Sequence, residues 1–183
     1  MFIQTETTPN PATLKFVPGE AVMERGTAFY ENADDAASSP LGQRLFAVKG
    51  VSGTFFGSDF IAVTLTDQDW ADRKTEVLGA IMEHFTSGDP VVTQETVEVP
   101  AAEENEEDAE IIAQIKELLE ARVRPAVARD GGDITFHAYV EGTVYLRMQG
   151  ACAGCPSSTA TLKYGIQNLL KHYIPEVENV EAV

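Results

Sequence analysis

Basic side chains are scarce in this chain of 183 residues: 13 Lys and Arg stand against 29 Asp and Glu, giving a formal net charge of −16. Binding to a phosphate backbone or to an anionic membrane surface relies on clustered Lys and Arg. We therefore expect neither nucleic acid nor a membrane among the partners. The sequence also has no apolar run of the roughly 18 residues that a helix needs to cross a bilayer.

Cysteine is nearly absent as well. The chain holds two, Cys152 and Cys155, which are three positions apart. A secreted disulfide scaffold carries more cysteines and spreads them along the chain. The count and the spacing instead predict a reducing compartment and a reactive or metal-binding pair.

Acidic residues are unevenly spread. Nine acids and no base lie between Asp89 and Glu110, together with two prolines and no aromatic residue. Such a segment cannot bury enough apolar surface to offset the entropy of ordering it, and its charges repel one another. We predict an extended linker over residues 89–109, which separates small domains at residues 1–88 and 110–183.

The first domain reads as a small α+β unit. Strand-like segments occur at 2–5 and 13–17, a hairpin at 51–56 and 60–65, and amphipathic helices from Pro40 and from Trp70 to Gly88. The unit has no Cys and no glycine-rich phosphate loop. His84 lies beside the apolar stripe of the second helix, where a structural role is favoured over a ligand role.

The second domain has an α-β-β-α-β order. A helix with an apolar face from Ile111 to Val123 precedes two strands, 134–140 and 144–149, which join at a tight Glu141-Gly142 turn. Alternation predicts that the first strand has one face made of Ile134, Phe136, Ala138 and Val140. A helix from Pro156 and a short strand over 177–183 follow, so the fold class is α+β throughout.

The two cysteines lie in the loop that enters this last helix. Pro156 suits the first helical position, which puts Cys155 at or near the N-cap, where free backbone N–H groups and the helix dipole favour a thiolate. The neighbouring residues are glycine and alanine, so the sequence predicts that a bulky group can approach both sulfurs. The segment from Asp130 to Asp133 is favoured as a helix stop and turn over a contact with a bound group.

Four interpretations of the pair are open. A thioredoxin-like dithiol shares the spacing but follows the first strand of a βαβ unit. A structural zinc site needs four ligands, and neither His137 nor His172 is spaced to supply them. Two buried cysteines without a role are the third possibility. An iron–sulfur cluster, commonly held by four thiolates, would require a second copy of the chain.

Two stretches of the sequence resemble the Nfu-type iron–sulfur cluster scaffold and carrier proteins. The C-terminal stretch runs from Val123 to Val183 and includes Asp130-Gly131-Gly132-Asp133 and the segment Gly150-Ala-Cys152-Ala-Gly-Cys155-Pro-Ser-Ser; it is similar to the NifU C-terminal domain. The opening, with Thr8-Pro9-Asn10-Pro11-Ala12-Thr13-Leu14-Lys15-Phe16 and Phe55-Phe56-Gly57-Ser58-Asp59-Phe60, resembles the Nfu N-terminal domain.

The resemblance implies a non-enzymatic carrier. It implies that Cys152 and Cys155 of two chains share one [4Fe–4S] cluster in a homodimer, which receives clusters from upstream assembly proteins and passes them to apo iron–sulfur proteins. The N-terminal domain would recognise partners. Members of this family in eukaryotes usually start with a presequence, so we expect a cytoplasmic, bacterial protein, with a mitochondrial matrix form as the alternative. A thioredoxin-like dithiol oxidoreductase is the alternative function.

Overall fold

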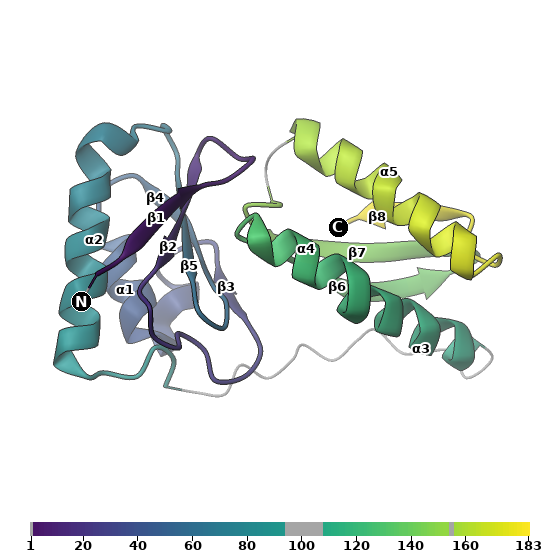
Figure 1. The fold of residues 1–183 in the computed structure, drawn as a ribbon, viewed down its shortest axis with the longest axis horizontal. Helices are drawn as coiled ribbons and strands as arrows, with labels where there is room; N and C mark the ends of the chain where they lie inside the picture. The colour runs from purple at the N-terminus through teal and green to yellow at the C-terminus, as the bar shows by residue number, and fades with distance from the viewer. Residues whose placement is uncertain (1, 94–107, 154–155) are drawn as a thin grey trace. The chain divides into compact units, whose positions relative to one another are not determined.

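The computed structural model describes residues 2–93, 108–153 and 156–183. The chain divides into two compact units, Met1–Val97 and Glu98–Val183, called the first and the second unit below (Figure 1). Both units combine a β-sheet with helices, so the predicted α+β fold class is confirmed. None of the helices in the described ranges is both long and apolar enough to cross a membrane.

The first unit is built on a five-stranded antiparallel sheet with the strand order β1-β2-β5-β4-β3. Helices α1 (Pro40–Phe46) and α2 (Trp70–Ser87) supply apolar side chains to a core that they share with this sheet. The strands are β1 (Gln4–Thr7), β2 (Thr13–Val17), β3 (Ala28–Tyr30), β4 (Val51–Phe56) and β5 (Ile61–Leu65), and a short 3-10 turn, η1 (Asp35–Ser38), precedes α1.

Helix α1 begins where the sequence predicts, and helix α2 both begins and ends where it predicts. At the start of α1, the Ser39 hydroxyl accepts a hydrogen bond from the Gly42 amide at 3.0 Å, and Pro40 takes the first helical position. At the end of α2, Gly88 adopts a left-handed conformation with φ of 72°, which glycine reaches without steric cost. Local capping therefore fixes these boundaries.

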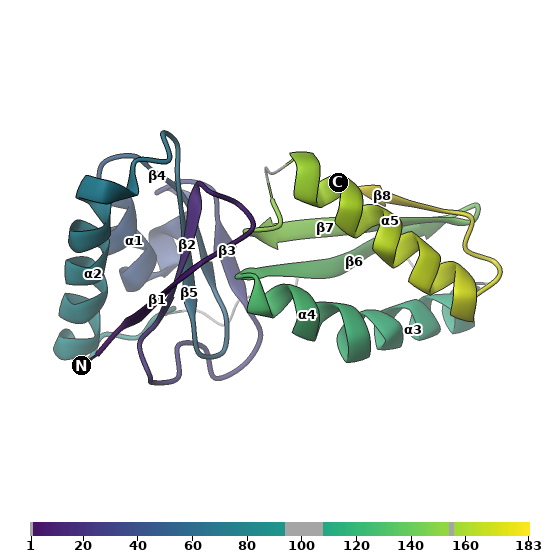
Figure 2. The ribbon, with the colours of Figure 1, turned by 45° about the horizontal axis from the view of Figure 1, so that its top comes forward.

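The second unit has a three-stranded sheet in the order β6-β7-β8, in which β6 (Gly132–Val140) and β7 (Thr143–Gly150) are antiparallel and β8 (Asn179–Ala182) runs parallel to β7. A helical run of α3 (Ala109–Leu118), a π-helical turn η3 (Leu119–Val123) and α4 (Arg124–Arg129) precedes the sheet. Helix α5 (Pro156–Tyr173) connects β7 to β8 (Figure 2). The predicted α-β-β-α-β order is confirmed.

The predicted face of β6 is wrong beyond Phe136. The ladder with β7 pairs Phe136 with Leu146 and then Ala138 with Tyr145, so His137 is an extra residue in a β-bulge. A bulge reverses which side of the sheet the following residues face. Tyr139 consequently packs against the core, whereas the side chain of Val140 is 53% exposed.

The start of the segment predicted as a linker is attached to the first unit. Asp89 pairs with Arg44 at 2.8 Å, and the carbonyl of Val91 accepts a hydrogen bond from the Ser39 hydroxyl. The Thr93 amide and hydroxyl both donate to the Ser38 carbonyl at 2.8 Å. The extended linker itself falls on residues 94–107, outside the described residues, and stays a prediction.

Candidate functional site

Cys152 lies just past the end of β7, at the connection to α5. The strand ends at Gly150, which has a φ of 64°, and the Ala153 amide donates to the Gly150 carbonyl at 3.0 Å. This turn sends the chain back over the sheet. As a result the Cys152 side chain enters the apolar core of the second unit and is 7% exposed.

Two contacts hold this turn from opposite sides. The Ala151 amide donates to the Gly131 carbonyl at 3.1 Å, which ties the turn to the residue preceding β6. From α5, the Thr159 hydroxyl donates to the Cys152 carbonyl at 3.3 Å. The position of Cys152 therefore depends on the start of β6 and on the first turns of α5.

Burial decides the ionisation of the Cys152 thiol. Loss of hydration raises its pKa to about 12, and the negative charges of Asp130 and Asp133 add to the shift. At neutral pH this sulfur is a protonated thiol. The sequence predicted that a bulky group can approach both sulfurs, and for Cys152 that prediction is wrong in this conformation, because the turn after β7 folds the side chain inward.

Cys155 lies outside the described residues, so its predicted place at the N-cap and the shared direction of the two sulfurs stay predictions. Helix α5 is described from Pro156, as the proline rule for the first helical turn predicts. Within the described ranges, no group of three or more His, Cys, Asp or Glu side chains is placed to hold a metal ion.

A half-buried ion pair between Arg124 and Asp133 lies at the start of β6. The Asp133 side chain is almost fully buried, and its two oxygens accept hydrogen bonds from the Arg124 guanidinium at 2.8 and 2.7 Å. The Ile134 amide also donates to this carboxylate at 2.8 Å. The carboxylate, and to a lesser extent Glu120, raises the pKa of Arg124.

Sequence reasoning missed this pair. Arg124 makes the contact with the buried Asp133 carboxylate. The available signal was Asp133 itself, a charged residue directly before an apolar strand. Buried carboxylates need a partner, and α4 brings Arg124 back to the beginning of β6. The Asp130–Asp133 segment does end the helix, since Gly131 has a φ of 79°.

His84 of α2 is a packed residue, as predicted. Its ring is 1% exposed and meets Phe85 edge-on at a centroid distance of 5.5 Å. Among the described residues, neither ring nitrogen has a hydrogen-bond partner. Burial, and next the charge of Arg44, lowers the pKa of His84, while Asp89 partly opposes the shift.

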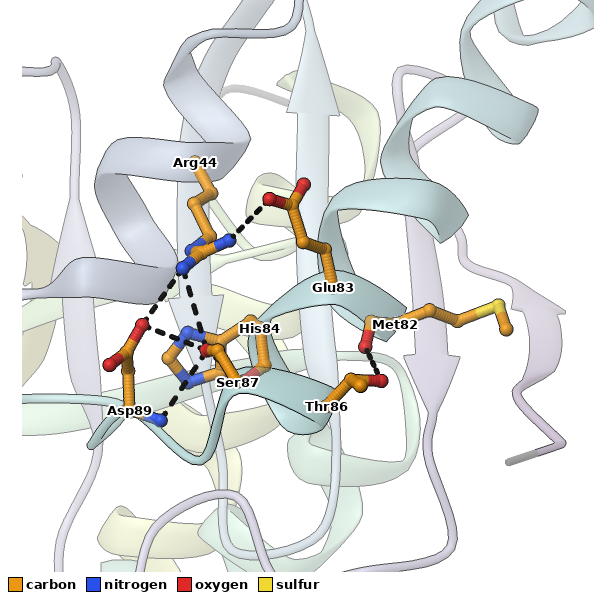
Figure 3. Close-up of polar contacts among 7 residues, drawn as sticks. All are labelled: Arg44, Met82, Glu83, His84, Thr86, Ser87 and Asp89. Atoms are coloured by element: carbon orange, nitrogen blue, oxygen red, sulfur yellow. Dashed lines mark hydrogen bonds and ion pairs between the residues drawn. The ribbon is translucent and has the colours of Figure 1, made fainter.

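A polar network that the sequence did not predict lies beside His84 (Figure 3). The Arg44 guanidinium pairs with Glu83 at 2.9 Å and with Asp89 at 2.8 Å. The Ser87 hydroxyl donates to the Asp89 carboxylate at 2.8 Å. This network fastens residue 89 to both helices of the first unit.

Comparison with known proteins covers both units. The model described as scaffold protein Nfu/NifU N terminal matches residues 3–88, and the model of the NifU-like domain matches residues 115–181. The Homo sapiens protein named NFU1 iron-sulfur cluster scaffold homolog, mitochondrial, is 50% identical over 185 residues, which span 100% of this chain and 72% of the human protein. NifU-like protein 4, mitochondrial, of Arabidopsis thaliana is 49% identical over 99% of this chain and 65% of that protein.

Both of these relatives are named as mitochondrial proteins, so the comparisons give no support to the predicted bacterial cytoplasmic location. Their similarity extends over the whole of this chain and includes both domain types. The chain therefore belongs to the Nfu family of iron–sulfur cluster scaffold proteins.

Proposed function

We propose that this chain carries a [4Fe–4S] cluster between two copies of itself and delivers it to apo iron–sulfur proteins. The observation that carries the proposal is the C-x-x-C pair. The only two cysteines among 183 residues are three positions apart, and they lie between the end of β7 and the start of α5. Thiolates are the usual ligands of such clusters. The name of the human relative as an iron–sulfur cluster scaffold supports the same role.

The number of cysteine ligands that the cluster needs is the reason for proposing a dimer. A [4Fe–4S] cluster is typically held by four thiolates, and one chain supplies two, Cys152 and Cys155. Two chains related by a two-fold axis would supply four. A cluster held in this way is released when the chains separate, because separation opens its coordination shell. That behaviour suits a carrier.

Cluster binding requires Cys152 to change its surroundings. In the conformation described here the thiol is buried and its pKa is about 12. A ligand thiolate must lose this proton and turn towards the second chain. The same burial disfavours the alternative dithiol oxidoreductase for Cys152, since an attacking thiol in that chemistry is exposed and has a lowered pKa.

The two domains divide the task. We assign cluster binding to residues 110–183, partner recognition to residues 1–88 and a connecting role to the acidic segment 89–109. Support comes from the placement of both cysteines in the second unit and from the absence of cysteine in the first. The mitochondrial names of the relatives favour the mitochondrial matrix as the location.

Anaerobic reconstitution with iron and sulfide tests the assignment. The wild-type chain is expected to bind about four irons per dimer, and Mössbauer spectra are expected to show the [4Fe–4S] type. Cys152→Ser and Cys155→Ser are each expected to abolish stable loading, whereas Ala160→Ser, an exposed position on α5, is expected to load normally. Normal iron uptake by Cys152→Ser would show that the ligand assignment is wrong.

Transfer needs its own measurement. The loaded dimer is mixed with an apo-enzyme that requires a [4Fe–4S] cluster, with an iron chelator present to remove free iron. We expect enzyme activity to return in the presence of the chelator, while free iron and sulfide under the same conditions restore none. Equal activation by both sources would refute the carrier role.

A further inference from the structure

Gly132, the first residue of β6, has no side chain, and the Cys152 side chain occupies the space that one would fill. A Cβ atom placed on Gly132 would stand 2.5 Å from the Cys152 Sγ, 2.8 Å from the Gln149 carbonyl oxygen and 2.9 Å from the Cys152 amide nitrogen. Non-bonded carbon and sulfur or oxygen atoms do not approach this closely. The space that a side chain of residue 132 would fill is thus taken by the sulfur and by the backbone beside it.

The backbone on both sides of this contact, at Gly132 and at the turn after β7, is held in place. Gly132 is paired with Gly150 in the β6–β7 ladder, and the neighbouring Gly131 carbonyl accepts a hydrogen bond from the Ala151 amide. On the other flank, Asp133 is fixed by the ion pair with Arg124. Of the three atoms that an added Cβ would strike, the sulfur is the one on a rotatable side chain.

Thr159 holds the same residue from the helix side. Its hydroxyl donates to the Cys152 carbonyl, so the peptide after the thiol is fixed to the first turns of α5. Cys152 is therefore positioned at its sulfur by β6 and at its carbonyl by α5. Gly132 and Thr159 are 27 residues apart in sequence, and neither is part of the C-x-x-C motif.

We infer that Gly132 and Thr159 are positioning residues for the proposed cluster ligand Cys152: the missing side chain of Gly132 provides the place that the sulfur occupies, and Thr159 holds the Cys152 backbone in it. That the positioned sulfur is a cluster ligand rests on the proposed function. The positioning itself is a property of the chain without a cluster and can be measured separately.

Alkylation of Cys152 by iodoacetamide reports the position of the sulfur. All variants carry Cys155→Ser, so that Cys152 is the only thiol in the chain. Gly132→Ala is expected to speed alkylation at least about tenfold, since overpacking at this level forces the side chain out of its site. Gly165→Ala is the matched control, because an added methyl on that α5 glycine meets no described atom within 4 Å outside its own helix; its rate is expected to equal that of the parent.

General loss of stability could also expose the thiol, so a second control is needed. Ile115→Val removes one methylene from a fully buried residue of α3 in the same core. Rates are compared at urea concentrations that give the two variants equal unfolding free energy. If Ile115→Val is then alkylated as fast as Gly132→Ala, the effect is general and the positioning role is refuted.

A double-mutant cycle examines the contact with the sulfur directly. Cys152→Ala removes the Sγ that an added Cβ would strike. Gly132→Ala is therefore expected to lower the urea midpoint less in a Cys152→Ala chain than in its Cys152 parent. Equal losses in both backgrounds would mean that the glycine serves only the backbone, which contradicts the proposal.

Thr159 keeps the proposal testable if Gly132→Ala fails to fold. Thr159→Val keeps the shape and removes the donor, and is expected to speed alkylation of Cys152; Thr159→Ser retains the hydroxyl and is expected to behave like the parent. No difference between Val and Ser at this position would refute the role of the hydroxyl.

Iron loading connects the inference to function. In chains that retain Cys155, Gly132→Ala is expected to bind less iron than Gly165→Ala under the same reconstitution. If the wild-type chain binds no iron, the proposed function is wrong, while the alkylation rates and the mutant cycle still decide whether Gly132 and Thr159 position Cys152.

Discussion

Asp133 illustrates how one buried charge organises its surroundings. Its carboxylate is 4% exposed and accepts hydrogen bonds from the Arg124 side chain and from the Ile134 amide. An unpaired charge at such a position is costly. The ion pair consequently fixes where α4 ends relative to the start of β6, next to the residue that accommodates the Cys152 sulfur.

Arg124→Gln is expected to lower the free energy of unfolding of the second unit by about 3 kcal/mol, because it leaves the Asp133 carboxylate buried without its cation. Urea denaturation measures the loss. Lys163→Gln is the control, since it breaks an ion pair with the exposed Glu181 and should have a much smaller effect. Equal effects of the two substitutions would contradict a half-buried, stabilising pair.

His84 should make the first unit sensitive to mild acid. Burial lowers the pKa of the folded-state imidazole below its ordinary 6.5, so the unfolded chain binds the proton first. Stability is then complete above pH 6.5 and falls as the pH drops below it, by up to about 1.4 kcal/mol per pH unit until the folded-state pKa is reached. The charged groups around the ring are Arg44, Glu83 and Asp89.

Urea denaturation at pH 7.5 and at pH 5.5 measures this loss. His84→Leu is expected to show a smaller difference between the two pH values than the wild type, whatever its stability at pH 7.5. An identical difference in both proteins would assign the acid sensitivity to other groups.

At the scale of helices and strands, the ends of helices and the tight turn are determined by nearby residues. The starts of α1 and α5, the end of α2 and the Glu141-Gly142 turn follow from residues within one turn of chain, and all are where the sequence predicts. The turn has positive φ at both positions, 47° and 77°, as a tight hairpin requires. Caps and turns are local, so they can be read from sequence.

Features that depend on residues far away in the sequence were not predicted. Strand β3 is three residues long and exists because it pairs with β4, more than 20 residues later. The bulge at His137 depends on the register with β7, and the burial of Cys152 depends on a glycine 20 positions earlier. The two cysteines of the candidate site could be found from the sequence, whereas the surroundings of Cys152 required the fold.

The π-helical turn η3 keeps the buried residues of α3 and α4 on one face of the helical run. The buried residues Ile115, Leu119, Val123 and Val127 recur every four positions. In an α-helix with 3.6 residues per turn such a row drifts around the axis. A wider π turn compensates the drift, so both α3 and α4 face the same core across Pro125.

Gly79 inside α2 and Gly88 at its C-cap should respond oppositely to alanine. Gly79 lies inside the helix, and an added methyl meets no described atom within 4 Å beyond the helix itself, so Gly79→Ala is expected to raise stability by about 1 kcal/mol. Gly88 has a left-handed conformation, so Gly88→Ala is expected to lower it by about 1 kcal/mol. Thermal and urea unfolding measure both; a shift of the same sign in the two variants would contradict the assigned end of α2.

At the scale of the whole molecule, the chain contains two separate hydrophobic cores. One gathers around Phe16, Leu45 and Ile81 in the first unit, and the other around Ile134, Leu146 and Leu170 in the second. No residue belongs to both clusters in the described part of the chain. Each unit therefore has its own source of stability.

Substitutions in one core should leave the other unit folded. Ile81→Ala is expected to cost about 2–5 kcal/mol and to lower amide hydrogen-exchange protection in β2, β4 and β5, with β6 and β7 unchanged. Leu170→Ala should give the reverse pattern. Loss of protection in both units from either substitution would show that they unfold together.

The burial of Cys152 also affects how fast its thiol reacts with oxidants and free metal ions. Peroxide and dissolved metal ions react with thiolates, and a protonated thiol buried in the core of the second unit offers them little. For the proposed cluster ligand, such burial would keep the sulfur reduced until a cluster is bound. In this conformation the Cys152 thiol is protonated and buried, so we expect it to react slowly with peroxide and with metal ions.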